Sequence, residues 1–212
     1  MTLKEALVKY HNFEIELLLA HVLGKPKEFV FLHPEYKLSN YQVLKLSSMV
    51  RRRQKGEPIA YILGYKDFMG LRFKVNKSVL IPRPETEWIL EHLSHGVIPA
   101  LWEESLQGKK KILRPAFLKP KKGETQNDAC IVRILDVGTG SGCIAVAIAH
   151  QCKVKSVKYK VQITASDISP AALKIAKENA RRHKTSVKFV LSDLLQNIKG
   201  KVHDRRIPSY TS

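Results

Sequence analysis

The first 56 positions of the chain show helical spacing of their apolar residues. These recur every three or four positions, and the clearest such face holds Ile15, Leu18, Leu19 and Val22. Residues 2–5 and 39–42 have the composition of capping boxes, Asn12 is placed to cap a second helix, and Gly24 is placed to end it. The pattern predicts a small all-helical N-terminal domain over residues 1–56.

The spacing changes at residue 57. Residues 58–75 hold two segments in which apolar and polar positions alternate, separated by residues 67–70, and this predicts a β-hairpin. Two prolines then keep the next loop extended, ahead of a helix that opens with acidic residues. Residues 57–94 are therefore predicted to be a hairpin linker and a rigid loop. Four residues of that loop could form one wall of a site: Arg83, Pro84, Glu85 and Thr86.

Residues 132–149 organise the rest of the chain, because they predict a strand, a glycine turn and a helix in succession. Ile134, Leu135 and Val137 are typical of a strand buried on both faces. The turn around Thr139 has glycines that permit positive φ and leave room for a ligand against bare backbone: Gly138, Gly140 and Gly142. The helix that follows would point its free N–H groups at that ligand.

The spacing of the glycines and the residue before them narrow the class of ligand. The order G-x-G-x-G differs from the dinucleotide fingerprint, and the Lys and Ser/Thr of a phosphate-binding loop are missing. Asp136 would repel a pyrophosphate but suits an ammonium or a sulfonium group. S-adenosylmethionine carries both of these groups.

A second strand–helix unit and a third strand support an α/β fold for residues 130–212. Strands are predicted over residues 161–165 and 187–191, and Ser169 followed by Pro170 opens a helix between them. Asp167 and Asp193 end these strands as Asp136 ends the first, and such an edge is where open α/β sheets bind ligands. An acid at the end of the second strand is where a ribose would be held. Each acid could instead serve only as a helix cap.

Composition adds a possible partner and a compartment. The chain has 37 basic and 19 acidic residues, a net charge of +18, which favours RNA or the ribosome as a neighbour but also suits a well-solvated lysine surface. The three cysteines have no zinc spacing, no metal site is indicated, and their odd number suits a reducing cytoplasm. No apolar run predicts a membrane span or a secretory signal. The basic and polar residues 95–129 predict an exposed insertion.

Three segments together resemble the HemK/PrmC release-factor glutamine N5-methyltransferases: residues 57–64, 80–87 and 136–142. The similarity runs from about residue 10 to Asp193. It implies a class I S-adenosylmethionine-dependent methyltransferase sheet, Rossmann-like and here incomplete, preceded by a helical domain that docks the release factor. The substrate would be the glutamine of the Gly-Gly-Gln motif in peptide chain release factors. The resemblance also implies a set of cofactor-binding residues: Asp136, Gly138, Thr139, Gly140 and Gly142 at the turn, Asp167 on the ribose, Asp193 near the adenine, and Ile168 as a further contact.

The sequence departs from the family where the catalytic Asn-Pro-Pro-Tyr is expected. That position holds Ile207, Pro208, Ser209 and Tyr210, and the isoleucine cannot accept the amide N–H bonds that the family's asparagine accepts. We therefore interpret the chain as a truncated or frame-damaged member whose catalysis is impaired. Two other functions stay open: an RNA or DNA amino-methyltransferase, and a non-catalytic fragment that binds a release factor or the ribosome.

Overall fold

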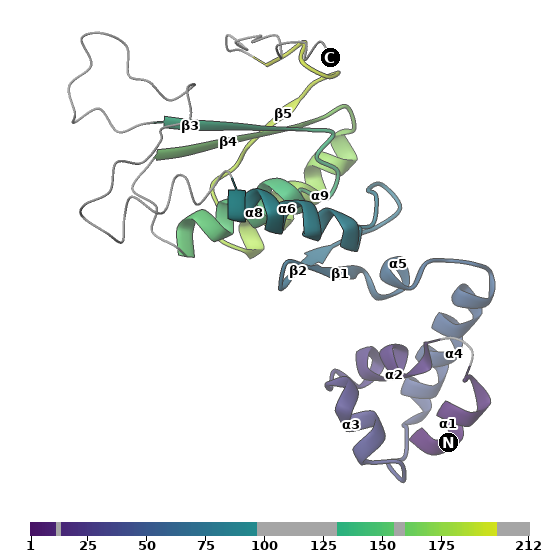
Figure 1. Cartoon of the computed structure of the whole chain (residues 1–212). Coiled ribbons are helices and arrows are strands. Elements are labelled where there is room, and N and C mark those ends of the chain that lie inside the picture. The colour runs from purple at the N-terminus through teal and green to yellow at the C-terminus, as the bar shows by residue number, and fades with distance from the viewer. Residues whose placement is uncertain (12–13, 97–130, 155–159, 199–212) are drawn as a thin grey trace, which may run out of the picture. The chain divides into compact units, whose positions relative to one another are not determined.

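The computed structural model describes residues 1–11, 14–96, 131–154 and 160–198, which form two compact units (Figure 1). The first unit runs from Met1 to Ile89 and the second from Leu90 to Ser212. The predicted insertion at residues 95–129 lies almost entirely outside the described residues.

The first unit begins with four helices, as the apolar spacing predicts. They are α1 (Leu3–Lys9), α2 (Ile15–Leu23), α3 (Lys27–Leu32) and α4 (Asn40–Gln54). Both capping boxes are confirmed: Thr2 and Glu5 exchange hydrogen bonds at the start of α1, and Ser39 and Gln42 do so at the start of α4. Gly24 ends α2 in the left-handed conformation, as predicted. The helices pack around fully buried apolar side chains, namely Leu3, Ala6, Leu18, Leu19, Val30 and Leu46.

The prediction that Asn12 caps α2 is wrong. The N-cap position is Glu14, which has a left-handed backbone with φ 44° and makes no side-chain cap hydrogen bond. Its carboxylate instead accepts two hydrogen bonds from the Arg53 guanidinium on α4, at 3.0 and 3.1 Å. A tertiary ion pair therefore sets the start of this helix, and a local capping pattern cannot reveal it.

The segment after α4 contains a short helix ahead of the hairpin. Ile59–Leu63 form α5, which ends at Gly64 with a positive φ, so the first predicted alternating segment is helical. The apolar residues of α5 point into the helical core, where Ile62 is buried, and this burial overrides their strand-like order. The hairpin itself is confirmed over β1 (Tyr65–Phe68) and β2 (Leu71–Lys74). Met69 and Gly70 form its two-residue turn, both with positive φ.

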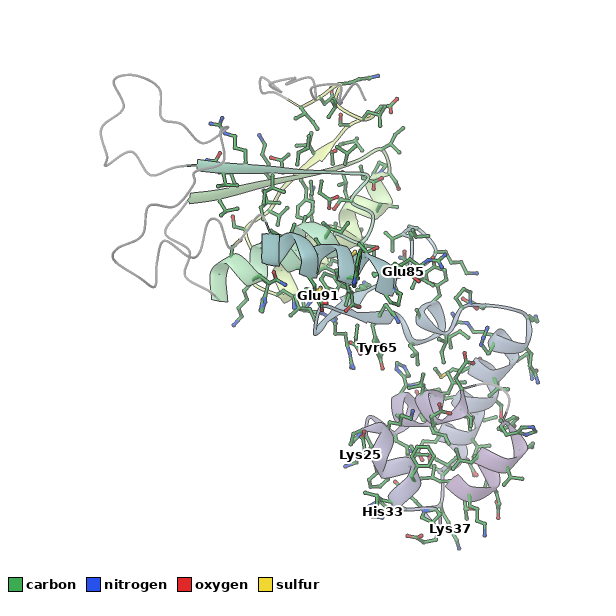
Figure 2. All side chains as sticks on the ribbon, in the orientation of Figure 1. Lys25, His33, Lys37, Tyr65, Glu85 and Glu91 are labelled. Atoms are coloured by element: carbon green, nitrogen blue, oxygen red, sulfur yellow. The ribbon has the colours of Figure 1, made fainter. Side chains whose placement is uncertain are left out.

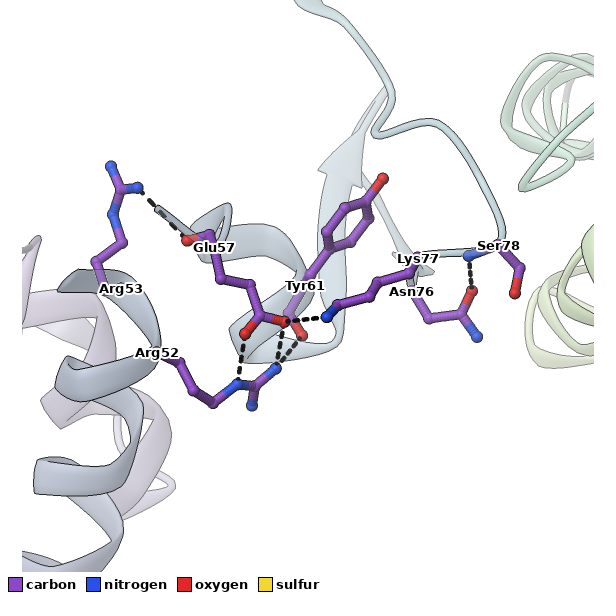
Figure 3. A network of polar contacts seen from close by, with 7 residues as sticks. All are labelled: Arg52, Arg53, Glu57, Tyr61, Asn76, Lys77 and Ser78. Atoms are coloured by element: carbon purple, nitrogen blue, oxygen red, sulfur yellow. Dashed lines mark hydrogen bonds and ion pairs between the residues drawn. The ribbon is translucent and has the colours of Figure 1, made fainter. Parts of the chain in front are cut away.

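Polar contacts tie α4 to α5 and to the residues after the hairpin (Figure 3). Arg52 donates two hydrogen bonds to the Glu57 carboxylate at 2.8 and 2.7 Å and a longer one to the Tyr61 carbonyl. Lys77 adds a second cation 3.9 Å from the same carboxylate. The hydrogen bonds from Arg52 and the nearby charges lower the pKa of Glu57. The Tyr61 hydroxyl donates to the Val79 carbonyl at 2.7 Å, so the loop after the hairpin is fixed to α5.

The predicted helix after the two prolines is α6 (Pro84–Gly96), with Glu85 and Glu87 in its first turn. Acidic residues are favoured there by the positive end of the helix dipole.

The second unit is a three-stranded parallel sheet with helical crossovers. Its elements are β3 (Ile131–Val137), α8 (Cys143–Val154), β4 (Lys160–Asp167), α9 (Pro170–Arg182) and β5 (Lys188–Leu191), and the strand order is β3-β4-β5. The three predicted strands are confirmed, as is Ser169 as the N-cap of α9. A small core forms between α8 and the sheet around Ala145, Ile163 and Ala165.

The prediction that β3 is buried on both faces is wrong. Leu135 is 37% exposed and Val137 is 41% exposed, whereas Ile134 packs against the core on the opposite face. Successive side chains of a strand point to opposite faces, and α8 and α9 lie on the same side of the sheet (Figure 1). The other face is open within the described part of the chain.

Among the described residues, no helix has both the length and the apolar character that a membrane span requires.

Candidate functional site

The glycine turn lies between β3 and α8, at the carboxyl edge of the parallel sheet. Gly138, Gly140 and Gly142 all have positive φ, at 72°, 54° and 79°. The Thr139 N–H donates to the Ser166 carbonyl at the end of β4, at 2.9 Å, which fixes the turn to the neighbouring strand. Within the turn, the Gly142 N–H donates to the Thr139 carbonyl at 2.8 Å.

Two of these glycines are required for different reasons. A Cβ at Gly138 would meet no atom within 4 Å, so the backbone there is open to a ligand. A Cβ at Gly142 would lie 3.0 Å from the Cβ of Ala176 on α9 and 3.2 Å from its Cα. Gly138 thus leaves space outside the turn, and Gly142 permits the close approach of α9 behind it.

Asp136 closes the end of β3 beneath the turn. Its carboxylate accepts a hydrogen bond from the Thr139 hydroxyl at 2.7 Å and one from the backbone of Ala145 in the first turn of α8. Burial raises the pKa of Asp136, the two hydrogen bonds oppose the rise, and the nearby Asp167 adds to it. Asp136 therefore serves as a cap for α8 and at the same time places a partly desolvated negative charge at the site.

We expect the raised pKa of Asp136 to give a measurable pH dependence. An acid that binds its proton more tightly in the folded state contributes stability below its ordinary pKa of 3.8, and that contribution is lost as pH rises through the raised value. Urea unfolding of the native chain and of Asp136→Asn, over a series of pH values, measures this contribution. The native chain should lose stability relative to the variant as pH rises, and a difference independent of pH would contradict the expectation.

Asp167 joins the turn to the start of α9. One carboxylate oxygen accepts from the Gly140 N–H at 2.8 Å, and the other accepts from the Ser169 N–H at 2.9 Å. A carboxylate offers about four acceptor positions, so two remain for the hydroxyls of a ligand. Asp167 therefore has a structural role in the turn and keeps acceptor capacity at the sheet edge.

Exposed apolar residues follow the ends of the two neighbouring strands. Ile168 comes directly after β4 and is 68% exposed, and Leu194 and Leu195 are exposed after β5. Asp193 is exposed beside them. A ligand with a flat apolar ring and polar edges would find both kinds of surface here.

The structure brings together some of the predicted site residues and leaves others untested. Asp136, Thr139, Gly140 and Asp167 are joined by hydrogen bonds. The loop residues Arg83, Pro84, Glu85 and Thr86 belong to the first unit, so their role as a wall of the site stays a prediction. The degenerate catalytic positions Ile207, Pro208, Ser209 and Tyr210 lie outside the described residues.

Sequence reasoning missed two polar residues behind the turn. Asn179 on α9 is fully buried and donates to the Ser141 carbonyl at 2.9 Å. Ser166 at the end of β4 is fully buried as well. The sequence signal for Asn179 was available, because an amide stands among the small apolar residues of the inner face of α9.

Near the turn, burial raises the pKa of the Cys143 thiol. In the parts of the chain that the structure describes, no group of three or more potential metal ligands occurs.

The residues of the site suit a cationic nucleoside. The open backbone at Gly138 admits a chain of atoms, the Asp136 charge suits a positive group, and the free acceptors of Asp167 suit a diol. Ile168 and Asp193 offer an apolar surface and a polar acceptor to a base. S-adenosylmethionine has all four of these features.

Comparison with known proteins finds a family match for the N-terminal part of the chain and another for the C-terminal part. Residues 1–64 match the PrmC N-terminal domain family, and residues 131–206 match a methyltransferase domain family. A release factor glutamine methyltransferase from Coxiella burnetii is 41% identical over 175 residues, which cover 82% of this chain and 50% of that protein. One from Koribacter versatilis is 37% identical over 86% of this chain and 53% of its own length.

A bifunctional methyltransferase from Rickettsia bellii is 36% identical over 88% of this chain and 32% of its own length. The chain thus spans about half the length of the two release factor glutamine methyltransferases, at 50% and 53%.

Proposed function

We propose that the chain, which belongs to the HemK/PrmC family of methyltransferases, binds S-adenosylmethionine and methylates the N5 atom of a release-factor glutamine. We propose also that its catalysis is impaired. The glutamine is that of the Gly-Gly-Gln motif, and the place of action is the cytoplasm, where translation ends. The observation that carries the proposal is the glycine turn held between Asp136 and Asp167, with open backbone at Gly138.

Each residue of the turn has a proposed contact. S-adenosylmethionine supplies, when bound, a methyl group on a positively charged sulfur. The backbone at Gly138, Thr139, Gly140 and Gly142 lines the amino-acid part of the cofactor, and the Asp136 charge favours its ammonium group. Asp167 accepts from the ribose hydroxyls, and Ile168 and Asp193 contact the adenine.

The acceptor side of the reaction depends on orientation. An amide nitrogen is a poor nucleophile because its lone pair is delocalised into the carbonyl, so catalysis requires hydrogen-bond acceptors that hold the nitrogen in line. Ile207 offers no such acceptor, while Pro208 and Tyr210 keep two positions of the family motif. We propose that this substitution is the cause of impairment, and that Arg83, Pro84, Glu85 and Thr86 form a wall of the site.

Restoring the amide tests the role of residue 207. We expect Ile207→Asn to increase methyl transfer to the release factor by about tenfold, because a hydrogen bond to the amide contributes about 0.5–1.5 kcal/mol. Incorporation of a labelled methyl group measures the change. Ile207→Val, which adds no acceptor, is the control, and an equal rate for all three chains would argue against the role.

The function itself is tested with cofactor and substrate separately. Isothermal titration with S-adenosylhomocysteine measures the cofactor site, and absence of binding would refute that half of the proposal. Methyl transfer is then assayed on an intact release factor, on one whose Gly-Gly-Gln glutamine is replaced, and on RNA. Transfer only to the intact release factor supports the proposal. Cofactor binding without any transfer favours the non-catalytic fragment that binds a release factor or the ribosome.

A second candidate, methylation or binding of RNA, is favoured by the outer face of α9. Lys174, Lys177 and Arg181 are exposed along one side of that helix, and Arg182 and Lys184 are exposed near its C-terminal end. Such a row of cations suits a phosphate backbone, and the net charge of +18 has the same sign. Transfer to RNA in the parallel assay would favour this candidate, and binding that disappears with salt would support the cationic face as its contact.

The helical region offers a surface for the release factor. Tyr41 and Leu44 are each 72% exposed on the first half of α4, and Phe31 and Leu32 are exposed at the end of α3. His33, which follows α3, lies at the end of the helical region away from Tyr65 of the hairpin (Figure 2). Tyrosine and phenylalanine are enriched at protein–protein interfaces. We propose that these exposed side chains dock the release factor.

Replacing both α4 residues tests the docking surface. We expect Tyr41→Ala combined with Leu44→Ala to weaken release-factor binding by about tenfold or more, because truncation of an interface hot spot costs about 2 kcal/mol or more. The unfolding temperature should stay unchanged, since both side chains face solvent. Surface plasmon resonance measures the affinity. Leu80→Ala, an exposed apolar residue outside the helical region, is the control and should bind as the native chain does.

A further inference from the structure

The peptide between Ser141 and Gly142 is the last one of the glycine turn before α8. The Gly142 carbonyl accepts from the Val146 N–H at 2.9 Å, so the hydrogen-bond ladder of α8 begins at Gly142. The Ser141 carbonyl precedes that ladder and therefore has no partner within the helix. Ser141 is only 1% exposed, so this carbonyl needs a donor from elsewhere in the protein.

Asn179 supplies that donor from a position 38 residues further along the chain. Its Nδ2 atom donates to the Ser141 carbonyl at 2.9 Å, and its side chain is fully buried. The N–H on the other side of the same peptide donates to the Thr139 carbonyl. A peptide unit is planar, so hydrogen bonds to both of its polar groups fix its orientation.

The inner face of α9 is otherwise apolar, which indicates that the Asn179 amide is there for its hydrogen bond. The other buried residues of α9 are apolar, namely Ala172, Leu173, Ile175, Ala176 and Ala180. Asparagine is a weak helix former and is costly to bury unless its groups are hydrogen-bonded. Ala176, one turn earlier, provides the flat surface against which Gly142 packs. The two α9 residues thus hold adjacent atoms of the turn, one by hydrogen bonding and one by contact.

We propose that Asn179 is a positioning residue for cofactor binding, which acts through the Ser141 carbonyl and does not touch the ligand. By fixing the Ser141–Gly142 peptide it sets the path of the turn from Thr139 onward, and with it the open backbone that faces the cofactor. This inference rests on the proposed function for its ligand, and its structural part can be measured without any ligand.

The test uses the full chain and three variants. Asn179→Leu replaces the amide with an apolar group of similar size, and Asn179→Ala deletes it. Ile175→Val is the control, because it shortens another buried side chain of α9 and leaves the amide in place. Hydrogen–deuterium exchange of the peptide covering residues 138–142 reports on the turn without ligand. Titration with S-adenosylhomocysteine then reports on binding.

Both Asn179 variants should exchange faster over residues 138–142 and bind S-adenosylhomocysteine about tenfold more weakly, a change of about 1.4 kcal/mol. Ile175→Val should change neither measurement by more than about twofold. Unchanged exchange in the Asn179 variants would overturn the inference. Faster exchange with unchanged affinity, or equal losses in the control, would overturn it too. If the native chain binds no S-adenosylhomocysteine, the proposed function fails, and the exchange measurement still decides whether Asn179 holds the turn.

Discussion

Replacing Gly142 by alanine is expected to destabilise the second unit by about 2–5 kcal/mol, as the sum of two separate costs. Its φ of 79° is unfavourable for alanine, which accounts for about 1–2 kcal/mol. The new Cβ would also press on Ala176 at 3.0 Å, and backbone atoms of a packed helix cannot move aside easily. Urea unfolding followed by circular dichroism measures the loss.

Two other glycines separate these costs. Gly64→Ala has the same φ of 79° with no atom within 4 Å, so we expect only the backbone cost of about 1–2 kcal/mol. Gly138→Ala should be as mild for stability but should weaken binding of S-adenosylhomocysteine, because its Cβ would project into the proposed ligand space. Equal destabilisation by all three substitutions would show that contact with α9 is not the reason for Gly142.

The second large effect is expected from Asp167→Asn. The NH2 group of asparagine replaces one carboxylate oxygen and cannot accept a hydrogen bond, so either the Gly140 or the Ser169 N–H would lose its partner, at about 1–3 kcal/mol. The same change removes acceptors proposed for the ribose. We expect affinity for S-adenosylhomocysteine to fall by about tenfold or more, together with a lower unfolding temperature.

Asp193→Asn is the matched control for Asp167→Asn. Asp193 is exposed at the end of the next strand, so its substitution should leave the unfolding temperature unchanged and weaken binding only mildly. An Asp167→Asn variant with full affinity would remove the assignment of Asp167 to the ribose.

Local signals in the sequence predicted the helices and strands well. The capping boxes at Thr2 and Ser39 act over three residues, so a short stretch of sequence contains all of the information needed. The predicted cap of α2 was wrong because the N-cap residue, Glu14, is held by Arg53, 39 residues away. The predicted strand at Ile59–Leu63 was wrong because burial in the helical core, and not the alternating pattern, determines the conformation of these residues.

For the candidate site too, local sequence signals revealed some residues, and contacts that form only on folding stayed hidden. Asp136, Asp167 and the glycines could be found because strand ends and turns are marked locally in the sequence. Their hydrogen-bond partners could not be found, since Asn179 meets Ser141 only after β4 and α9 have folded onto the turn. The exposed face of β3 was also missed, because an apolar run does not reveal which of its faces another element covers.

The contacts of Arg52 and Arg53 bear on how the chain can be divided for expression. A fragment ending at residue 56 would discard Glu57, the partner of Arg52, and Ile62 from the helical core. Ending after Val79 instead would keep both, together with the acceptor of the Tyr61 hydroxyl. The longer fragment is thus the better starting material for spectroscopic work on the helical region.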